Sequence, residues 1–326
     1  MKASKVKLAN LPTPISKATR FSAELGAEVY IKRDDFTGIE ISGNKVRKLE
    51  YVFKQVLEQG YKSVITTGGL QSNHCRATTA VATKLGLKTT LLLRKTEDPV
   101  VEGNFFLDKL FGAEIIFCTP DEYRQSRNQI MNKIALEKQN NGEKCFVVPE
   151  GASFGIGSMG YFNAMEEILD QEKEMGIVFD TIVSATGSGG TYSGLYLANK
   201  YFNLNKTIIG FSVCDDSHYF KNHINNINKE AIDYLDKEID LTTDDIHIND
   251  KYSGIGYAIS RPEELEFIEY FARLEAIVLD PVYTGKAMYG LYNEIKAGTF
   301  DNAGNILFIH TGGLFGLFPK QSQFEY

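Results

Sequence analysis

Short runs of β-branched and other apolar residues alternate along this chain with longer amphipathic stretches. The runs that we expect to form strands are 29–35, 63–69, 89–94, 114–118, 145–151, 181–187, 207–213 and 306–313. Between them, apolar residues recur at helical spacing, which predicts helices over 44–60 and 72–86 among others. Such alternation is typical of βα units, whose strands join into mostly parallel sheets. The pattern therefore predicts an α/β fold.

Length and composition limit the class of protein further. The chain has 326 residues, more than the roughly 100–200 of one ordinary domain, and its 43% hydrophobic and 24% charged residues are typical of a globular protein. A net charge of −7 argues against nucleic acid as a partner. No stretch reaches the roughly 18 apolar residues that a membrane span needs, and the N-terminal segment lacks the apolar core of a secretory signal. We expect a cytoplasmic protein without membrane contact.

Neither a metal site nor a disulfide framework is expected. The four cysteines stand far apart without a CxxC pair, and the five histidines include no HExxH motif. We expect free, buried thiols and no metal. The adjacent acidic pairs 34–35, 215–216 and 244–245 diverge on a helix or strand, so they are typical of caps and turns.

A glycine-rich loop follows the expected strand 181–187. It consists of Gly187, Ser188, Gly189, Gly190 and Thr191, and a helix follows it. Backbone N–H groups and hydroxyls at a helix N-terminus bind anions well, and phosphate is the natural ligand. A Walker loop is excluded because no lysine follows the last glycine. Taken alone, the loop could also be a tight turn that needs glycine only for packing.

A second glycine motif, GxGxxG, spans 155–160. A dinucleotide site also needs an acidic residue at the end of the next strand, and that strand ends in Ala185, Thr186 and Gly187 instead. We expect 155–160 to be a glycine-rich loop that connects domains. An NAD-linked oxidoreductase stays open as a remote alternative, as does a non-catalytic binding protein.

Lys45 lies at the start of the helix expected over 44–60. A cation there opposes the helix dipole, so a lysine is unfavourable unless an anion or a covalent partner compensates. A solvated lysine is the simpler explanation. In combination with a phosphate-binding loop, however, such an amine suits an enzyme that uses pyridoxal phosphate.

The residues Gln71, Ser72, Asn73 and His74 follow another expected strand and open a helix. Free N–H groups with serine and asparagine side chains at that turn could bind the carboxylate of an amino acid. Ser72 or Asn73 could also cap the helix without any ligand.

These segments resemble the fold-type II pyridoxal phosphate enzymes, and within them the group of 1-aminocyclopropane-1-carboxylate deaminase and D-cysteine desulfhydrase. The resemblance covers nearly the whole chain. Its motifs are LPTPIS, YIKRDD, SGNKVRKLEY, GGLQSNHCR, PEGAS, TGSGGT, GIGY, LDPVYTGKAM and HTGG, in that order from residue 11 to residue 313.

The resemblance implies a fold like that of the tryptophan synthase β subunit, with two open, twisted, mostly parallel sheets flanked by helices. It places a small α/β domain over 48–160, inserted into a large cofactor domain of 1–47 and 161–326. It also implies a homodimer.

The resemblance also implies roles for individual residues. Lys45 would form the Schiff base with pyridoxal 5′-phosphate, and Lys48 with loop 187–191 would hold the phosphate. Asn73 would bind the phenolic oxygen of the cofactor, while Ser72 and its neighbours Gln71 and His74 would hold the substrate carboxylate. Tyr257 and Tyr283 match the two active-site tyrosines of the family.

Positions that differ within the group favour D-cysteine desulfhydrase, which releases pyruvate, hydrogen sulfide and ammonia. This sequence has Thr284 where the deaminases look to have Glu, and Thr311 where they look to have Leu. It has SNH where they look to have SNQ. One of these threonines would lie beside the pyridine nitrogen. Ala258 departs from both subgroups. The alternatives are a deaminase of 1-aminocyclopropane-1-carboxylate, which yields 2-oxobutanoate and ammonia, and a cysteate-type sulfo-lyase.

Overall fold

Two β-sheets organise the protein in the computed structural model, which describes residues 2–324. The larger sheet has the order β1-β2-β10-β7-β8-β9, and only β1 runs antiparallel to its neighbour. Its strands are β1 (Ile15–Lys17), β2 (Glu28–Lys32), β7 (Phe179–Thr186), β8 (Thr207–Ser212), β9 (His247–Asn249) and β10 (Asn305–Ile309). The smaller sheet is entirely parallel, with the order β5-β4-β3-β6. Its strands are β3 (Ser63–Gly69), β4 (Lys88–Arg94), β5 (Glu114–Cys118) and β6 (Cys145–Val147). The predicted α/β fold class is confirmed.

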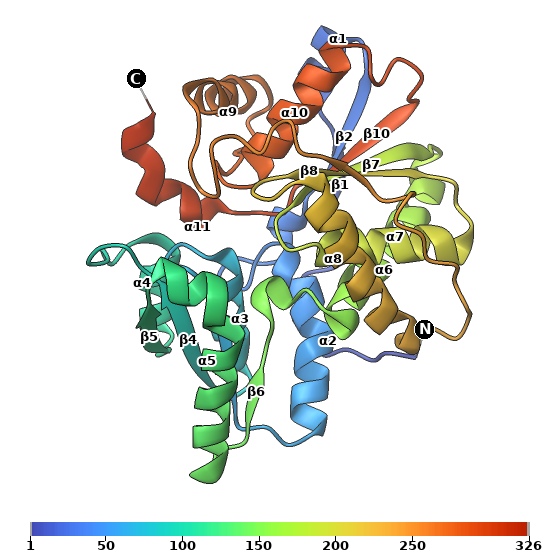
Figure 1. Ribbon diagram of the computed structural model, residues 1–326. Coiled ribbons are helices and arrows are strands. Elements are labelled where there is room, and N and C mark those ends of the chain that lie inside the picture. Colours follow the sequence, from blue (N-terminus) through green and yellow to red (C-terminus); the bar gives the residue numbers. More distant parts are fainter. Residues whose placement is uncertain (1, 325–326) are drawn as a thin grey trace.

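Helices cover both sheets (Figure 1). They are α1 (Thr19–Leu25), α2 (Asn44–Glu58), α3 (Asn73–Lys84), α4 (Gly103–Leu110), α5 (Pro120–Asn140), α6 (Gly155–Met175), α7 (Gly190–Phe202), α8 (Ser217–Ala231), α9 (Pro262–Glu275), α10 (Thr284–Lys296) and α11 (Leu314–Leu317). Single 3₁₀ turns are η1 (Asp34–Phe36), η2 (Glu150–Ala152) and η3 (Ile232–Tyr234), and η4 is Phe318–Gln323.

The core is divided by the larger sheet. One cluster of buried residues joins α2, α6, α7 and α8 to one face of that sheet, and it extends into α3. A second cluster joins α1, α9 and α10 to the other face. All four strands of the smaller sheet lie between Ser63 and Val147, within the stretch expected as an insert. The limits 48–160 for that domain stay a prediction, and the large domain as predicted includes residues 1 and 325–326, which lie outside the described residues.

The segment 155–160 is not a connecting loop, as the sequence analysis expected, but the first turns of α6. Its glycines allow close packing rather than a turn. A Cβ on Gly160 would lie 2.5 Å from the backbone carbonyl of Arg47, so only glycine lets α6 approach α2 this closely. Two short strands, β1 and β9, were not expected, because three residues are too few to show a pattern.

Asp34 lies in a turn, η1, as expected for an acidic pair, but its side chain has a further role that the sequence did not indicate. Its carboxylate is fully buried and accepts hydrogen bonds from Arg47 at 2.8 Å and from the Tyr161 hydroxyl at 2.5 Å. Arg47 also contacts Glu167 at 2.9 Å. This network joins η1, α2 and α6. Asp216 caps α8, as the acidic-pair interpretation suggests.

Candidate active site

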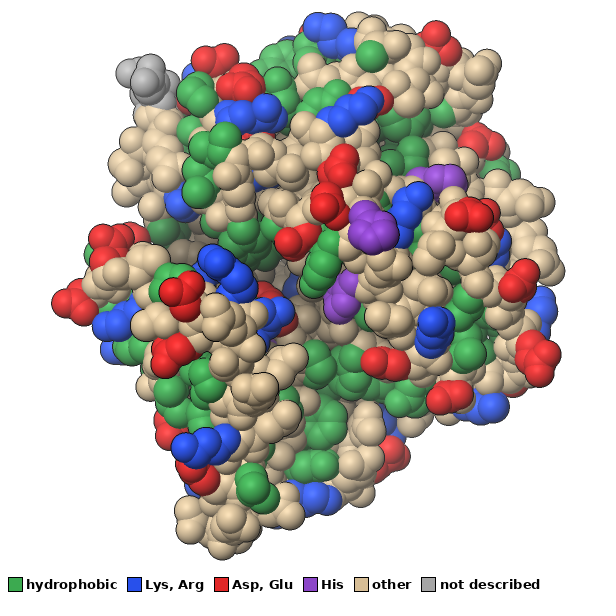
Figure 2. Space-filling model, in the orientation of Figure 1, with side chains coloured by type: hydrophobic (Ala, Val, Ile, Leu, Met, Phe, Trp, Pro, Cys, Tyr) green, Lys and Arg blue, Asp and Glu red, His purple; other side chains and the backbone are tan. Residues whose placement is uncertain are grey.

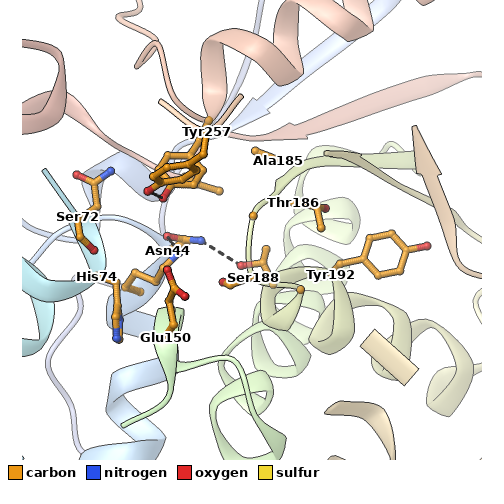
Figure 3. A pocket seen from close by; sticks show the side chains of 17 residues that line it. Asn44, Ser72, His74, Glu150, Ala185, Thr186, Ser188, Tyr192 and Tyr257 are labelled. Carbon is orange, nitrogen blue, oxygen red and sulfur yellow. Dashed lines mark hydrogen bonds between the residues drawn. The ribbon is translucent and has the colours of Figure 1, made fainter. Parts of the chain in front are cut away.

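One pocket collects most of the residues that the sequence analysis singled out. It lies where β3, β7 and β10 end and α2, α3 and α7 begin, and it contains about 670 Å³ of space not filled by atoms. Figure 2 shows the surface hollowed between the part of the molecule that contains the larger sheet and the part that contains the smaller sheet. Carboxyl ends of parallel strands are where α/β proteins bind ligands. In Figure 3, Ser72 and His74 lie on one side of this pocket and Thr186 and Ser188 on the other.

Lys45 lines the pocket from the first turn of α2. Its Nζ donates to Asn44 Oδ1 at 3.2 Å and lies 5.9 Å from the centre of the Tyr283 ring. Loss of hydration inside the protein lowers the pKa of Lys45 to about 8, although Glu150 and Asp280 act in the opposite direction. With this pKa roughly a tenth of the amine is free at pH 7, far more than of an ordinary lysine, and the free amine is the form that acts as a nucleophile or base.

The loop 187–191 forms the opposite wall. Gly189 has φ 77°, in the left-handed region, and Gly190 begins α7. A Cβ on Gly190 would lie 2.7 Å from Ser153 Oγ and 2.8 Å from Lys48 Nζ, so a side chain there would displace both. Asn44 ties the loop to α2, because its Nδ2 donates to Thr191 Oγ1 at 3.0 Å.

Lys48 lies directly behind this loop. Its Nζ donates to Gly151 O at 3.2 Å and to Ser153 Oγ at 3.0 Å, both neutral acceptors. Burial, and then the charge of Lys45, hold the pKa of Lys48 well below its usual value. An anion at the loop would relieve both effects. Lys48 in its protonated form, a glycine-rich helix N-terminus and the Ser153 and Ser188 hydroxyls therefore fit a phosphate ester such as that of pyridoxal phosphate.

The N-terminus of α3 forms a second wall of the pocket. Ser72 is the N-cap, and its Oγ accepts from the Cys75 N–H at 3.2 Å. Asn73 lines the pocket on the next position. His74 is buried between the Thr66 and Thr78 hydroxyls, and burial holds its pKa well below the usual value. The ring is neutral, so His74 adds no charge for a carboxylate.

Two tyrosines and a threonine complete the pocket. The hydroxyls of Tyr257 and Tyr283 form a hydrogen bond of 2.5 Å. Burial raises the pKa of both phenols, so both are protonated at neutral pH. Thr311, after β10, also lines the pocket.

Four predicted residues do not line the pocket. Thr284 is fully buried, and its hydroxyl donates to Asp280 Oδ1 at 2.7 Å while accepting from the Asp280 N–H. Gln71 binds α4 through the Glu102 carbonyl and the Asn104 N–H. Lys48 and Gly190 lie behind the pocket lining. Of the two threonines, the geometry leaves only Thr311 facing a ligand, because the Thr284 hydroxyl is already used within the loop.

Asn44 and Glu150 also line the pocket, although neither was predicted from the sequence to be a site residue. Glu150 accepts a hydrogen bond from Tyr123, and Arg127 lies 3.6 Å from it. Both residues lie in segments already singled out, beside Lys45 and at the end of an expected strand. Residues 2–324 contain no group of three or more His, Cys, Asp or Glu side chains placed to hold a metal ion. Over the same residues, no helix is both long and apolar enough to cross a membrane.

Comparisons with known proteins show the family of this chain. A model of the family "Pyridoxal-phosphate dependent enzyme" matches residues 6–312. A mitochondrial bifunctional D-cysteine desulfhydrase/1-aminocyclopropane-1-carboxylate deaminase of Arabidopsis thaliana is 41% identical over 97% of this chain and 80% of its own length. A D-cysteine desulfhydrase of Salmonella typhi is 37% identical over 96% of this chain and 95% of its own. The crystal structure of an ACC deaminase homologue superposes with a TM-score of 0.91 at 38% identity, covering 99% of this chain and 95% of that one.

Proposed function

The chain belongs to the pyridoxal-phosphate dependent enzymes, and we propose that it cleaves a small amino acid by β-elimination, with D-cysteine as the substrate. Water and D-cysteine would yield pyruvate, hydrogen sulfide and ammonia. The observation that carries this proposal is the position of the Lys45 amine, in a pocket with one anion-binding helix end on each side. Such a pocket suits a phosphate on one side and an amino-acid carboxylate on the other.

The residues on the two sides of the pocket would then have different roles. When bound, pyridoxal phosphate supplies an electron sink for the charge that develops at the substrate Cα. Lys48 and the loop 187–191 would hold the phosphate, and Asn73 would meet the phenolic oxygen. Ser72 and the free N–H groups of α3 would hold the carboxylate, while Lys45 removes the Cα proton.

The other residues would act around the reacting atoms. Tyr257 and Tyr283 are protonated and so can donate a hydrogen bond to the leaving sulfur. We propose that Thr311, rather than Thr284, meets the pyridine nitrogen, since Thr311 lines the pocket. A neutral hydroxyl imposes no positive charge on that nitrogen, and elimination from a substrate with a Cα proton tolerates this.

A second activity has its own support. The Arabidopsis relative is named for both reactions, and the solved neighbour is titled an ACC deaminase homologue. 1-Aminocyclopropane-1-carboxylate has no Cα proton, so ring opening would need a different first step from the one that Lys45 offers D-cysteine. The SNH triplet and Thr311 favour D-cysteine as the better substrate.

Product analysis tests the substrate. We expect sulfide and pyruvate from D-cysteine faster than 2-oxobutanoate from 1-aminocyclopropane-1-carboxylate, with L-cysteine, β-chloro-D-alanine and cysteate assayed in parallel. Faster ring opening than sulfide release would make the deaminase the correct assignment. Faster sulfite release from cysteate would make it a sulfo-lyase.

Replacement of Lys45 tests the mechanism. Lys45→Ala should lose the visible absorbance of the covalently bound cofactor together with turnover, because one amine both attaches the cofactor and takes the proton. The enzyme without Lys45 should still fold, as circular dichroism would verify. Retained turnover in this variant would overturn the mechanism.

Three further expectations belong to the same proposal. We propose a homodimer, a cytoplasmic location and a small domain limited to 48–160. The first is checked by sedimentation at micromolar concentration, where a monomer would contradict it. Limited proteolysis checks the domain limits, since cleavage should concentrate where the chain passes between the two sheets.

A further inference from the structure

A buried chain of hydrogen bonds runs from Arg76 to the pocket. Arg76 and Asn104 are 1% and 0% exposed. Arg76 Nε donates to Asn104 Oδ1 at 3.1 Å, and Asn104 Nδ2 donates to Asn73 Oδ1 at 2.8 Å. The same Nδ2 donates to the backbone carbonyl of Gln71 at 3.0 Å. Asn73 is the last member of this chain, and it lines the pocket.

These hydrogen bonds can run in only one direction, from Arg76 through Asn104 to Asn73. An arginine side chain can only donate, and a backbone carbonyl can only accept. If the Asn104 amide were turned over, its NH₂ would face the Arg76 donor and its oxygen would face the Gln71 carbonyl. Both contacts would be repulsive in a buried site, where an unsatisfied polar group costs most. Asn104 therefore always presents its NH₂ to Asn73.

The orientation of the Asn104 amide determines the orientation of the Asn73 amide, which lines the pocket. Because Asn73 must accept from Asn104, its own Nδ2 is turned away from Asn104, and within residues 2–324 no protein acceptor takes that group. The amide thus offers a hydrogen-bond donor to a ligand. We propose that Asn104, oriented by Arg76, is a positioning residue that makes Asn73 a donor to an anionic oxygen in the pocket.

Arg76 links the same chain to the lysine side of the pocket. Its other nitrogens donate to the carbonyls of Glu40 at 2.5 Å and Ser42 at 3.3 Å, in the loop that leads to Lys45. The Phe315 ring lies 5.2 Å from the guanidinium. One guanidinium therefore sets the position of the loop before Lys45 and the polarity of Asn73 together.

The inference rests on the proposed function only in that the pocket takes pyridoxal phosphate, and it is independent of the amino acid cleaved. The phenolic oxygen of that cofactor is the anionic oxygen that Asn73 would meet. A hydrogen bond donated to such an oxygen favours its deprotonated form. Loss of the donor should weaken binding and make protonation easier.

Asn104→Asp is the sharpest test, because it changes one atom group. The carboxylate still accepts from Arg76 but cannot donate to Asn73, whose amide then turns its NH₂ toward the carboxylate and its oxygen toward the pocket. We expect at least about tenfold weaker binding of pyridoxal phosphate in titrations of the apoenzyme. We also expect the midpoint of the pH titration of the bound cofactor's absorbance to rise by about one unit.

Phe105→Leu is the matched control on the same helix. Phe105 is 1% exposed and packs α4 against β4 and Cys75, and its side chain has no polar atom that could take part in the amide hydrogen bonds. It should lower the melting temperature and leave the pH midpoint unchanged. If Asn104→Asp does not fold, Asn104→Ser serves instead, since its hydroxyl is too short to reach Asn73.

The outcomes separate clearly. A folded Asn104 variant with wild-type affinity and wild-type pH midpoint would overturn the inference, and so would an equal midpoint shift in Phe105→Leu. Failure of the wild-type protein to bind pyridoxal phosphate would instead contradict the proposed function. Wild-type binding without sulfide release would change the substrate and leave the role of Asn104 standing.

Discussion

At the scale of single residues, the pocket depends on an amine whose surroundings change its acidity. Lys45 has lost much of its hydration, which lowers its pKa to about 8. Lys48, three positions further along, is also buried, and its amine donates hydrogen bonds only to neutral acceptors. The two lysines lie one turn apart on α2 and face different parts of the site, Lys45 the pocket and Lys48 the rear of the loop 187–191.

The pKa of Lys45 predicts how its reactivity depends on pH. Below a pH of about 8 the amine is mostly protonated and unreactive, and above it the free amine predominates. We expect the acylation rate of Lys45 in the apoenzyme to rise with pH to a midpoint near this value, and mass spectrometry of digests would measure it. The control is Nα-acetyl-lysine in the same buffers, because its free ε-amine has the usual pKa of about 10.4. Equal midpoints would mean that the site does not perturb this amine.

At the scale of elements, the ends of the helices show where local chemistry is favourable and where it is strained. Ser72 caps α3, and Thr119 forms a capping box with Glu122 at the start of α5. By contrast, the residue that follows α9 is Ala276, which has φ 55°, in a region that favours glycine. Its N–H still closes the helix by donating to Ala272 O at 2.9 Å.

Ala276→Gly should therefore stabilise the protein. The backbone strain that glycine relieves should outweigh the free-energy cost of its greater entropy in the unfolded chain. We therefore expect the free energy of unfolding to rise by up to about 1 kcal/mol. Ala297→Gly at the end of α10 is the control, because Ala297 has φ −83° and no strain to relieve. It should lose about 0.5–1 kcal/mol. Urea unfolding would compare them, and equal effects would show that the strain is not felt.

At the scale of the whole molecule, a buried charge network fixes α2 against the larger sheet. Arg47 and Asp34 are 1% and 0% exposed and lie 2.8 Å apart, while Glu167 and Lys32 extend the network to α6 and β2. Since Lys45 and Lys48 also lie on α2, the network determines where both lysines meet the loop 187–191. Its residues come from segments more than 100 positions apart.

Arg47→Met should destabilise the protein strongly. It leaves the Asp34 carboxylate buried without its cation, which typically costs about 3–5 kcal/mol. Lys54→Met is the control on the same helix, because Lys54 forms an exposed pair with Glu58 at 2.9 Å. That change should cost no more than about 0.5 kcal/mol. Similar free energies of unfolding for the two variants would contradict the role of the network.

The network also predicts a dependence of stability on pH. Burial by itself raises the pKa of Asp34, but Arg47, Lys32 and Tyr161 together hold it below the ordinary value. The carboxylate therefore contributes stability above its unfolded pKa of about 3.9, and this contribution is lost as the pH falls through the lower folded pKa. We expect the free energy of unfolding to fall more steeply below pH 4 in the wild type than in Asp34→Asn. Parallel curves would count against the shift.

The sequence by itself determined the elements and the chemistry of the main turns. Strands, helices, the glycine loop 187–191, the cap at Ser72 and the position of Lys45 at a helix start all depend on neighbours within a few positions, and such local preferences can be read along the chain. The resemblance to a family added the expected roles of these residues.

Only the tertiary structure decided which candidate faces the pocket and which is buried behind it. Thr311 rather than Thr284 lines the site, because Asp280 takes the Thr284 hydroxyl. The glycines at 155–160 lie in the helix α6, where Gly160 lets α2 pack closely and Gly155 does the same for α8. Asn104 orients Asn73 from 31 positions away. Burial and hydrogen-bond partners come from distant segments, whose approach is set by packing of the whole chain and leaves no periodic trace in the sequence.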